Sequence, residues 1–200
     1  MFPLAKNFIP THEMLLSIMM RKVKMKGTRF MIIFKATKDT LKDLNVKPEI
    51  IEHPADAFFS WHVNFFKLYG KKHYVFMNDF SRLSLTVTGI RTNQANKLKE
   101  VFLNHLQDYF AVEQIPEALA NSYIKECSEE VITKTDNRSV IGTMNEMMLI
   151  LNTIQHENDD LRDEAMRHQW NNRIIYKPID YKYPIEVFVK ELENRFKNEN

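Results

Sequence analysis

Apolar residues recur at every second position through one long stretch of the chain, residues 57–90. This spacing puts alternate side chains on opposite faces of a strand, so it predicts strands with one face in the core. Turn-forming residues interrupt the stretch at Gly70-Lys71-Lys72 and again at 78–81. We therefore predict a meander of three antiparallel strands, which supplies most of a sheet.

Outside this stretch the apolar spacing is mostly that of helices. Short apolar runs predict two more strands, at 30–35 and 131–135. Helices are expected after a cap at Thr92 or Asn93, from Pro116 to about Cys127, over 139–156, over the charged segment 156–170, and from Pro184. This order predicts an α+β fold in which several helices cover an antiparallel sheet built on the meander.

Charge divides the chain at about residue 30. Residues 1–30 carry six Lys or Arg and only Glu13, a net +5, whereas the other 170 residues carry 22 basic and 25 acidic side chains, a net −3. We expect a single α+β domain over 31–200, whose near-neutral charge gives no support for nucleic-acid binding. The extension 1–30 has three interpretations: an amphipathic helix, a basic arm, or a segment upstream of a native start at Met31.

Several function classes are disfavoured by what the sequence lacks. The apolar run at 14–20 is too short to span a membrane, and the lone Cys127 excludes an internal disulfide, so we expect a soluble, cytoplasmic protein. The fingerprints GxGxxG, GxxxxGK[ST], GxSxG, HExxH and CxxC are all absent. We expect no cofactor.

The first candidate site lies in the first strand of the meander, where Ser60, His62 and Asn64 occupy alternate positions. Such residues share one strand face about 6.5–7 Å apart, too far for His62 to activate Ser60 directly. The row suits either ligand contacts or a structural network. His62 and Asn64 are therefore candidate ligand-binding residues.

The second candidate is the segment 133–147, where a strand is expected to lead into a helix. Free amides at a helix N-terminus favour an anion, and Arg138 can add a bidentate contact. Arg138, Ser139 and Asn145 are candidate ligands here, and Lys72 could meet a phosphate. A capped helix with an ion-paired arginine is the structural alternative. The partner expected from this reasoning is an anionic small molecule.

The third candidate is the cluster of His and acidic residues in 156–168. Such a density of ligand types can bind a metal, but Arg162 and Arg167 are interleaved with the carboxylates. An ion-paired, solvated helix explains this pattern more simply. We expect no metal site.

Several stretches resemble an uncharacterised family of small bacterial and archaeal proteins, catalogued as a domain of unknown function. They are MIIFKATKDTLKDL from Met31, SWHVNFF, GKKHYVFMND and TKTDNRSVIGTMNEM. The positions that carry the resemblance are Trp61, His62 and Asn64; Lys71 and Lys72, where an Arg-Lys pair is usual; Asn78; and Arg138, Ser139, Gly142, Met144 and Asn145. The similarity runs over about 31–196 and implies no activity.

These observations lead to three functional hypotheses. The first is a non-enzymatic binding or regulatory module, because no nucleophile and base have a workable spacing. The second is a hydrolase or nuclease-like enzyme acting on a phosphorylated substrate, with His62 as general base and Arg138 stabilising charge. The third is a protein-interaction partner of the toxin–antitoxin type.

Overall fold

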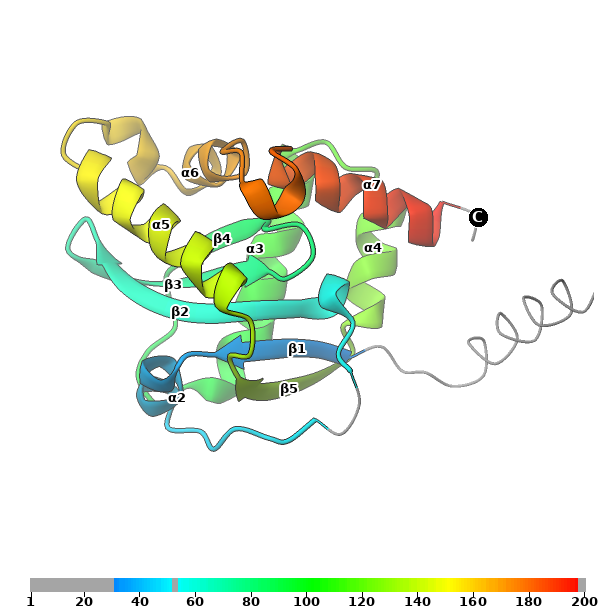
Figure 1. The fold of residues 1–200 in the computed structure, drawn as a ribbon, viewed down its shortest axis with the longest axis horizontal. Coiled ribbons are helices and arrows are strands. Elements are labelled where there is room, and N and C mark those ends of the chain that lie inside the picture. The colour runs from blue at the N-terminus through cyan, green and yellow to red at the C-terminus, as the bar shows by residue number, and fades with distance from the viewer. Residues whose placement is uncertain (1–30, 52–53, 198–200) are drawn as a thin grey trace, which may run out of the picture.

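The computed structural model describes residues 31–51 and 54–197 and contains one five-stranded sheet (Figure 1). The strand order is β4-β3-β2-β1-β5. The strands are β1 (Met31–Ala36), β2 (Ser60–Leu68), β3 (Lys71–Asn78), β4 (Ser84–Val87) and β5 (Glu129–Lys134). The extension 1–30 lies outside the described residues.

The α+β class is confirmed, but the purely antiparallel sheet is wrong. Strands β2, β3 and β4 form the expected antiparallel meander, whereas β1 pairs in parallel with both β2 and β5. The chain returns between parallel strands through α2 (Lys38–Leu44), and later through α3 (Leu98–Val112) and α4 (Glu117–Glu126). Alternation in a sequence defines the faces of a strand but not its direction, which depends on these crossovers.

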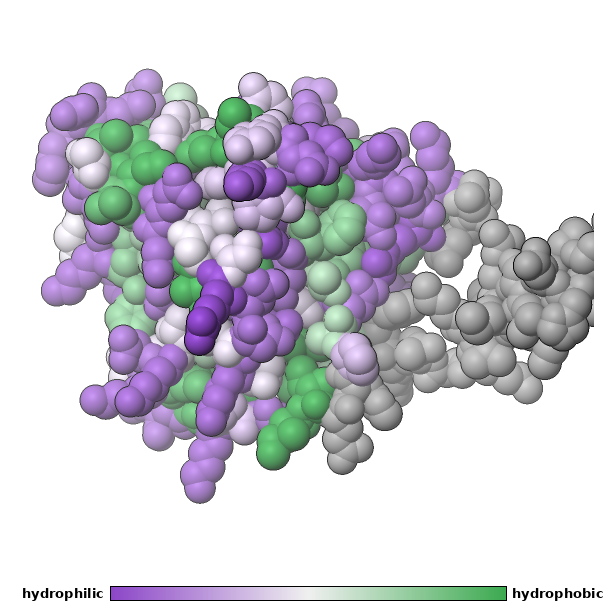
Figure 2. All heavy atoms as spheres, in the orientation of Figure 1, coloured by the Kyte–Doolittle hydropathy of each residue, from purple (hydrophilic) through white to green (hydrophobic). Residues whose placement is uncertain are grey.

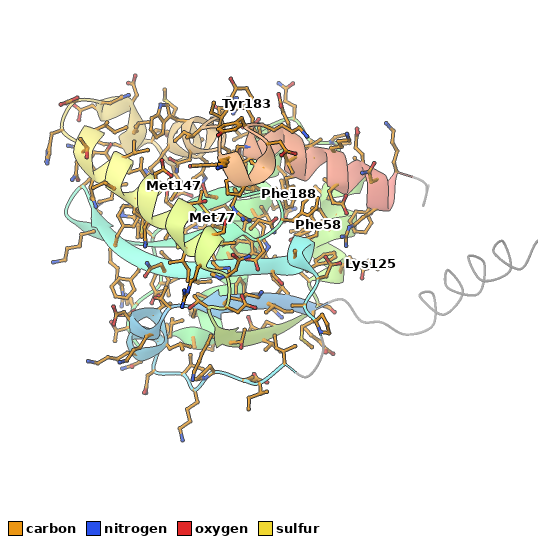
Figure 3. All side chains as sticks on the ribbon, in the orientation of Figure 1. Phe58, Met77, Lys125, Met147, Tyr183 and Phe188 are labelled. Atoms are coloured by element: carbon orange, nitrogen blue, oxygen red, sulfur yellow. The ribbon has the colours of Figure 1, made fainter. Side chains whose placement is uncertain are left out.

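Helices cover both faces of the sheet. The side chains of α3, α4 and α7 (Pro184–Phe196) pack on one face around Trp61, and Phe58 meets Phe188 of α7 with ring centroids 4.8 Å apart. On the other face α5 (Arg138–Ile154) crosses β2 and β3, and Met77 and Met147 fill the space between helix and sheet (Figure 3). The strand face of His62 therefore lies beneath α5.

Local geometry adjusts two of the predicted boundaries. Tyr69 and Gly70 both have positive φ, 49° and 74°, which is the geometry of a two-residue hairpin turn. The turn expected at Gly70-Lys71-Lys72 therefore ends at Gly70, and both lysines belong to β3. The predicted cap of the 92–110 helix is also wrong, because α3 begins at Leu98 without a side-chain cap.

The charged segment 156–170 forms a short 3-10 turn, Asp159–Arg162, followed by α6 (Glu164–Asn171). Asp163 caps α6 by accepting from the amide of Met166, and Arg162 pairs with Asp159 at 2.8 Å. Helix α6 packs on β4, where buried Arg167 and His168 contact Thr86. The 3-10 turn of this segment is thus solvated, whereas α6 packs on the edge strand β4.

The surface is mixed in character. Figure 2 shows apolar side chains on this face of the molecule in separate groups among polar ones. None of the helices within 31–51 and 54–197 is long and apolar enough to cross a membrane.

His168 should make the stability of the fold depend on pH. Burial lowers the pKa of His168 to about 4, and its Nε2 accepts from the amide of Thr86 at 2.9 Å. The unfolded chain, with a pKa near the usual 6.5, therefore binds a proton between pH 6.5 and 4 that the folded chain does not. The contribution of neutral, buried His168 to the free energy of unfolding is therefore complete above pH 6.5 and is lost as the pH falls towards 4.

We expect His168→Gln to flatten the fall in unfolding free energy between pH 6.5 and 4 by up to about 1.4 kcal/mol per pH unit. Glutamine can still accept from the amide of Thr86 but does not titrate in this range. Urea denaturation at several pH values measures the slope. His156→Gln, at an exposed position, is the control and should match the wild type. Equal slopes in all three proteins would contradict the role of His168.

Candidate functional site

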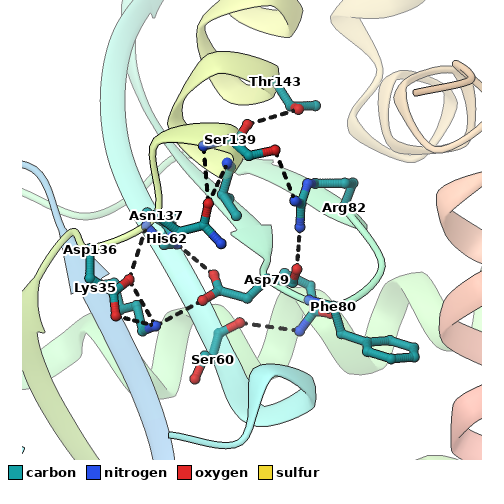
Figure 4. Close-up of polar contacts among 12 residues, drawn as sticks. Lys35, Ser60, His62, Asp79, Phe80, Arg82, Asp136, Asn137, Ser139 and Thr143 are labelled. Carbon is teal, nitrogen blue, oxygen red and sulfur yellow. Dashed lines mark hydrogen bonds and ion pairs between the residues drawn. The ribbon is translucent and has the colours of Figure 1, made fainter. Parts of the chain in front are cut away.

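A cluster of charged and polar side chains lies where β1, β3 and β5 end, beside the first turn of α5 (Figure 4). Lys35 comes from β1, His62 from β2, Asp79 from the turn after β3, and Asp136 from the turn after β5. Because β1 pairs in register with β2, Lys35 and His62 are directly opposite each other. The parallel pairing of β1 with β5 then brings Asp136 to the same point.

His62 is fully buried, and its two ring nitrogens have different surroundings. Nδ1 lies 2.5 Å from Oδ1 of Asp79. An ionised carboxylate can only accept, so Nδ1 carries the proton and, in the neutral ring, Nε2 carries the lone pair. Nε2 is buried without a hydrogen-bond partner, and Oδ1 of Asp136 is 3.7 Å away. The imidazole is therefore held in one tautomer with its basic nitrogen directed at Asp136.

Lys35 connects the two carboxylates. Its Nζ lies 2.9 Å from Oδ2 of Asp79 and 2.9 and 2.8 Å from the two oxygens of Asp136. Burial lowers the pKa of Lys35, but the hydrogen bonds to Asp136 and Asp79 outweigh burial, and the net pKa is raised. Lys35 is therefore a cation. With a neutral imidazole, these four residues carry one net negative charge.

Arg82 connects the turn that carries Asp79 to the first turn of α5. Its guanidinium donates to the carbonyl oxygen of Asp79 and, at 3.4 Å, to Oγ of Ser139. Burial lowers the pKa of Arg82, partly offset by the charge of Asp79. Arg82 has φ 65°, in the turn between β3 and β4. The turn that carries Asp79 is thus fixed to the first turn of the helix.

Asn78 explains why the sequence places Asp79 here. Its side-chain oxygen accepts from the amides of Phe80 and Ser81, while its Nδ2 donates to the carbonyl of Phe58. The amide of Asp79 in turn donates to the carbonyl of Ser60 at 2.9 Å. Asn78 therefore stabilises the turn through its side chain, and Asp79, the next residue, places its carboxylate beside His62.

The N-terminus of α5 does not favour the anion expected there. Oδ1 of Asn137 already accepts from the amides of Ser139 and Val140, so the helix is capped by its own side chain. The carboxylate of Asp136 precedes this cap and is 60% exposed. An anion at this point would face a like charge.

Access to the cluster is available from one side. A cavity of about 540 Å³ lies between the C-terminal end of β5 and the connecting residues 48–51 and 54–55. Lys35 and Asp136 line it, as do residues 133–135. The exposed carboxylate of Asp136 therefore lies between solvent and the buried nitrogen of His62.

Of the ligand-binding residues predicted from the sequence, only some lie at this cluster. His62 is at the centre, and Ser139 reaches the cluster through Arg82. Asn64 lies on the same strand face as His62, where its Oδ1 accepts from the hydroxyl of Thr37. The side chains of Arg138 and Asn145 are exposed and form no hydrogen bond or ion pair with any residue that the structure describes.

Lys72 is not part of this cluster. It lies on the opposite face of the sheet, where it pairs with Asp43 of α2 at 2.7 Å and its ammonium lies over the ring of Phe65. In the β2–β3 register Lys72 is opposite Lys67, and Lys67 is an odd number of residues from His62 along β2, so both lysines lie on the face opposite His62.

Sequence reasoning missed the partners of His62. Asp79 falls within the predicted turn 78–81, Asp136 within the segment 133–147 expected to lead from strand to helix, and Lys35 at the end of the predicted strand 30–35. One signal was available for Lys35, since it is the only charged residue in the strand MIIFKA, where a buried lysine requires a counter-charge.

Replacing Lys35 should destabilise the fold. In Lys35→Met the carboxylate of Asp79, only 4% exposed, loses its ammonium partner, and breaking such a pair costs about 3–5 kcal/mol. The free energy of unfolding in urea measures the loss. Lys38→Met, at an exposed position three residues along, should remain within about 0.5 kcal/mol of the wild type. A similar small effect at Lys35 would show that the ion network is not required for stability.

Comparison with known proteins supports the resemblance seen in the sequence. No curated protein matches the chain significantly. A family model does match, over residues 33–187, and this range includes Lys35, His62, Asp79 and Asp136. The match covers well over half of the sequence. The chain therefore belongs to the family described as a domain of unknown function, DUF6933.

Proposed function

We propose that this protein is a binding module that takes a cationic group at Nε2 of His62 and the carboxylate of Asp136. The observation that carries the proposal is a fully buried imidazole nitrogen with no hydrogen-bond partner, 3.7 Å from a carboxylate that is 60% exposed. A ligand that contacts both atoms would satisfy the nitrogen and neutralise the charge. The proposal keeps a binding module as the function but replaces the expected anion with a cation.

A purely structural role explains this arrangement less well. Leaving a buried polar atom unpaired costs about 1–3 kcal/mol. Two polar side chains of α6 show how such groups are satisfied: Nε2 of His168 accepts from Thr86, and Arg167 donates to the hydroxyl of Thr86 and the carbonyl of Leu161. Other buried atoms, among them the hydroxyl of Tyr109 and the side-chain amide of Asn171, lack a hydrogen-bond partner as Nε2 of His62 does. Unsatisfied or strained groups that a fold retains are typical of functional sites.

Charge decides the class of ligand. Lys35, Asp79 and Asp136 together carry one net negative charge, and the guanidinium of Arg82 contacts the backbone carbonyl of Asp79 and the hydroxyl of Ser139 rather than either carboxylate. Oδ1 of Asp136 and Nε2 of His62 are both lone-pair donors, and neither offers a proton to an anion. An ammonium, a guanidinium or a metal ion fits both requirements.

The proposal predicts that a cation stabilises the folded protein. Small ammonium and guanidinium compounds and divalent metal ions, tested one at a time, should include at least one that raises the melting temperature of the wild type. A ligand at 100 times its Kd adds about 2.7 kcal/mol, which corresponds to several degrees for a chain of this size. Asp136→Asn should abolish the shift. Asp160→Asn, at an exposed position outside the cluster, should retain it.

Two outcomes would contradict the proposal. In the first, no cation in the panel changes the melting temperature of the wild type. In the second, Asp136→Asn responds as strongly as the wild type, which would place binding elsewhere on the chain.

A second candidate function, hydrolysis of a phosphorylated substrate, is favoured by one specific contact. The 2.5 Å approach of Nδ1 to Asp79 fixes the imidazole in the tautomer that a general base requires. Arg138, expected to stabilise charge in this role, has no contact with the cluster. The candidate therefore depends on His62, with Asp79 as a positioning residue.

If the protein is such an enzyme, His62→Gln should lower the turnover of a phosphomonoester or phosphodiester reporter by about 10²–10⁴-fold, the usual contribution of a general base. The reporter is p-nitrophenyl phosphate or its bis-ester, assayed between pH 5 and 9, with circular dichroism to show that the variant is folded. His156→Gln is the matched control. Turnover that is absent in the wild type, or equal in wild type and His62→Gln, would exclude this candidate.

A further inference from the structure

The imidazole nitrogen of His62 and the carboxylate oxygen of Asp136 favour one class of cation. An imidazole nitrogen and a carboxylate oxygen together are typical ligands of divalent transition metals, whereas Mg²⁺ and Ca²⁺ prefer oxygen alone. His62, Asp79 and Asp136 each offer a ligand atom within 4.8 Å of the others. Such a group is not evidence by itself, but here Nε2 of His62 is fully buried, has no hydrogen-bond partner and lies 3.7 Å from Oδ1 of Asp136.

The separation of Nε2 of His62 and Oδ1 of Asp136 fits a shared metal ion. Metal bonds of about 2.0–2.1 Å to nitrogen and oxygen put two ligand atoms of a tetrahedral site about 3.4 Å apart. Nε2 of His62 and Oδ1 of Asp136 are 3.7 Å apart, and Asp136 lies on an exposed turn that can adjust by a few tenths of an ångström. A direct hydrogen bond would need about 2.9 Å, so the observed gap suits an intervening ion better than direct contact.

The surroundings of His62 match those of a metal-bound histidine. A histidine that binds a metal through one nitrogen usually donates the other N–H to a carboxylate, which fixes the ring and raises its basicity. Asp79 fills that role at Nδ1. Asp79 itself is held by Lys35 at one oxygen and by the turn that Asn78 closes. The supporting contacts of such a site are therefore present in the structure.

From these observations, and resting on the proposed function, we infer that the protein binds a divalent transition-metal ion through Nε2 of His62 and Oδ1 of Asp136. Asp79 positions the imidazole, and Lys35 keeps the cluster from carrying two uncompensated charges. A dipositive ion leaves the cluster with one net positive charge. Asp136 also lines the cavity beside β5, and from that side water or an anionic group of a further ligand can complete the coordination.

Isothermal titration of the full chain tests the inference, after removal of metals with EDTA and dialysis. Zn²⁺ and Co²⁺ should bind at one site that Mg²⁺ does not occupy at the same concentration. The visible absorption of bound Co²⁺ should intensify, as expected for a site of low coordination number. His62→Gln and Asp136→Asn should weaken this binding at least tenfold, while His156→Gln and Asp160→Asn should leave it unchanged.

The variants separate the possible failures. Asp136 is largely exposed, so Asp136→Asn should fold even if His62→Gln does not, and circular dichroism checks both. Binding of Zn²⁺ or Co²⁺ that is absent in the wild type, or undiminished in Asp136→Asn, would overturn the metal inference. If an ammonium or guanidinium compound still stabilises the wild type but not Asp136→Asn, the binding module stands and only the metal is wrong. If no cation binds, both fall.

Discussion

One ammonium group holds together three strand ends that are far apart in the sequence. Nζ of Lys35 on β1 lies within 2.9 Å of carboxylates that follow β3 and β5. Without this cation, the buried carboxylate of Asp79 would lie near that of Asp136 with no counter-charge, and the cost is large because Asp79 is only 4% exposed. The position of His62 depends on the same contact, because Asp79 accepts from its imidazole with one oxygen and from Lys35 with the other.

The faces of the sheet were predictable from sequence, and its directions were not. Alternation puts Trp61 and His62 on opposite faces of β2, and in the structure Trp61 lies in the main core and His62 on the other face. The parallel pairing of β1 is invisible to alternation, because it depends on how α2, α3 and α4 return the chain. That pairing also decides which side chains meet, so an error in strand direction conceals the site even when each strand is found.

Whether each site residue could be predicted from the sequence depends on how much of its role is local. His62 was identifiable as a polar residue inside an apolar strand. Asp79 and Asp136 could not be joined to it from sequence, since each has a sufficient local explanation as a turn former. Lys72 was placed in a turn, but the two-residue turn at Tyr69-Gly70 makes it a strand residue and so fixes it on the far face with Asp43. The length and position of a turn thus decide which residues belong to the following strand, and so the face of the sheet on which a charged side chain lies.

The contact between Lys35 and Asp136 spans 101 positions of the chain. Contacts of this sequence separation close late in folding, because a long segment must be ordered before they form. A nascent chain therefore has neither the ion pair nor a directed imidazole until β5 docks beside β1. Any species that occupies the cluster would bind only the completed sheet, and hydrogen exchange of the β1 and β5 amides would slow in its presence, since binding would oppose their separation.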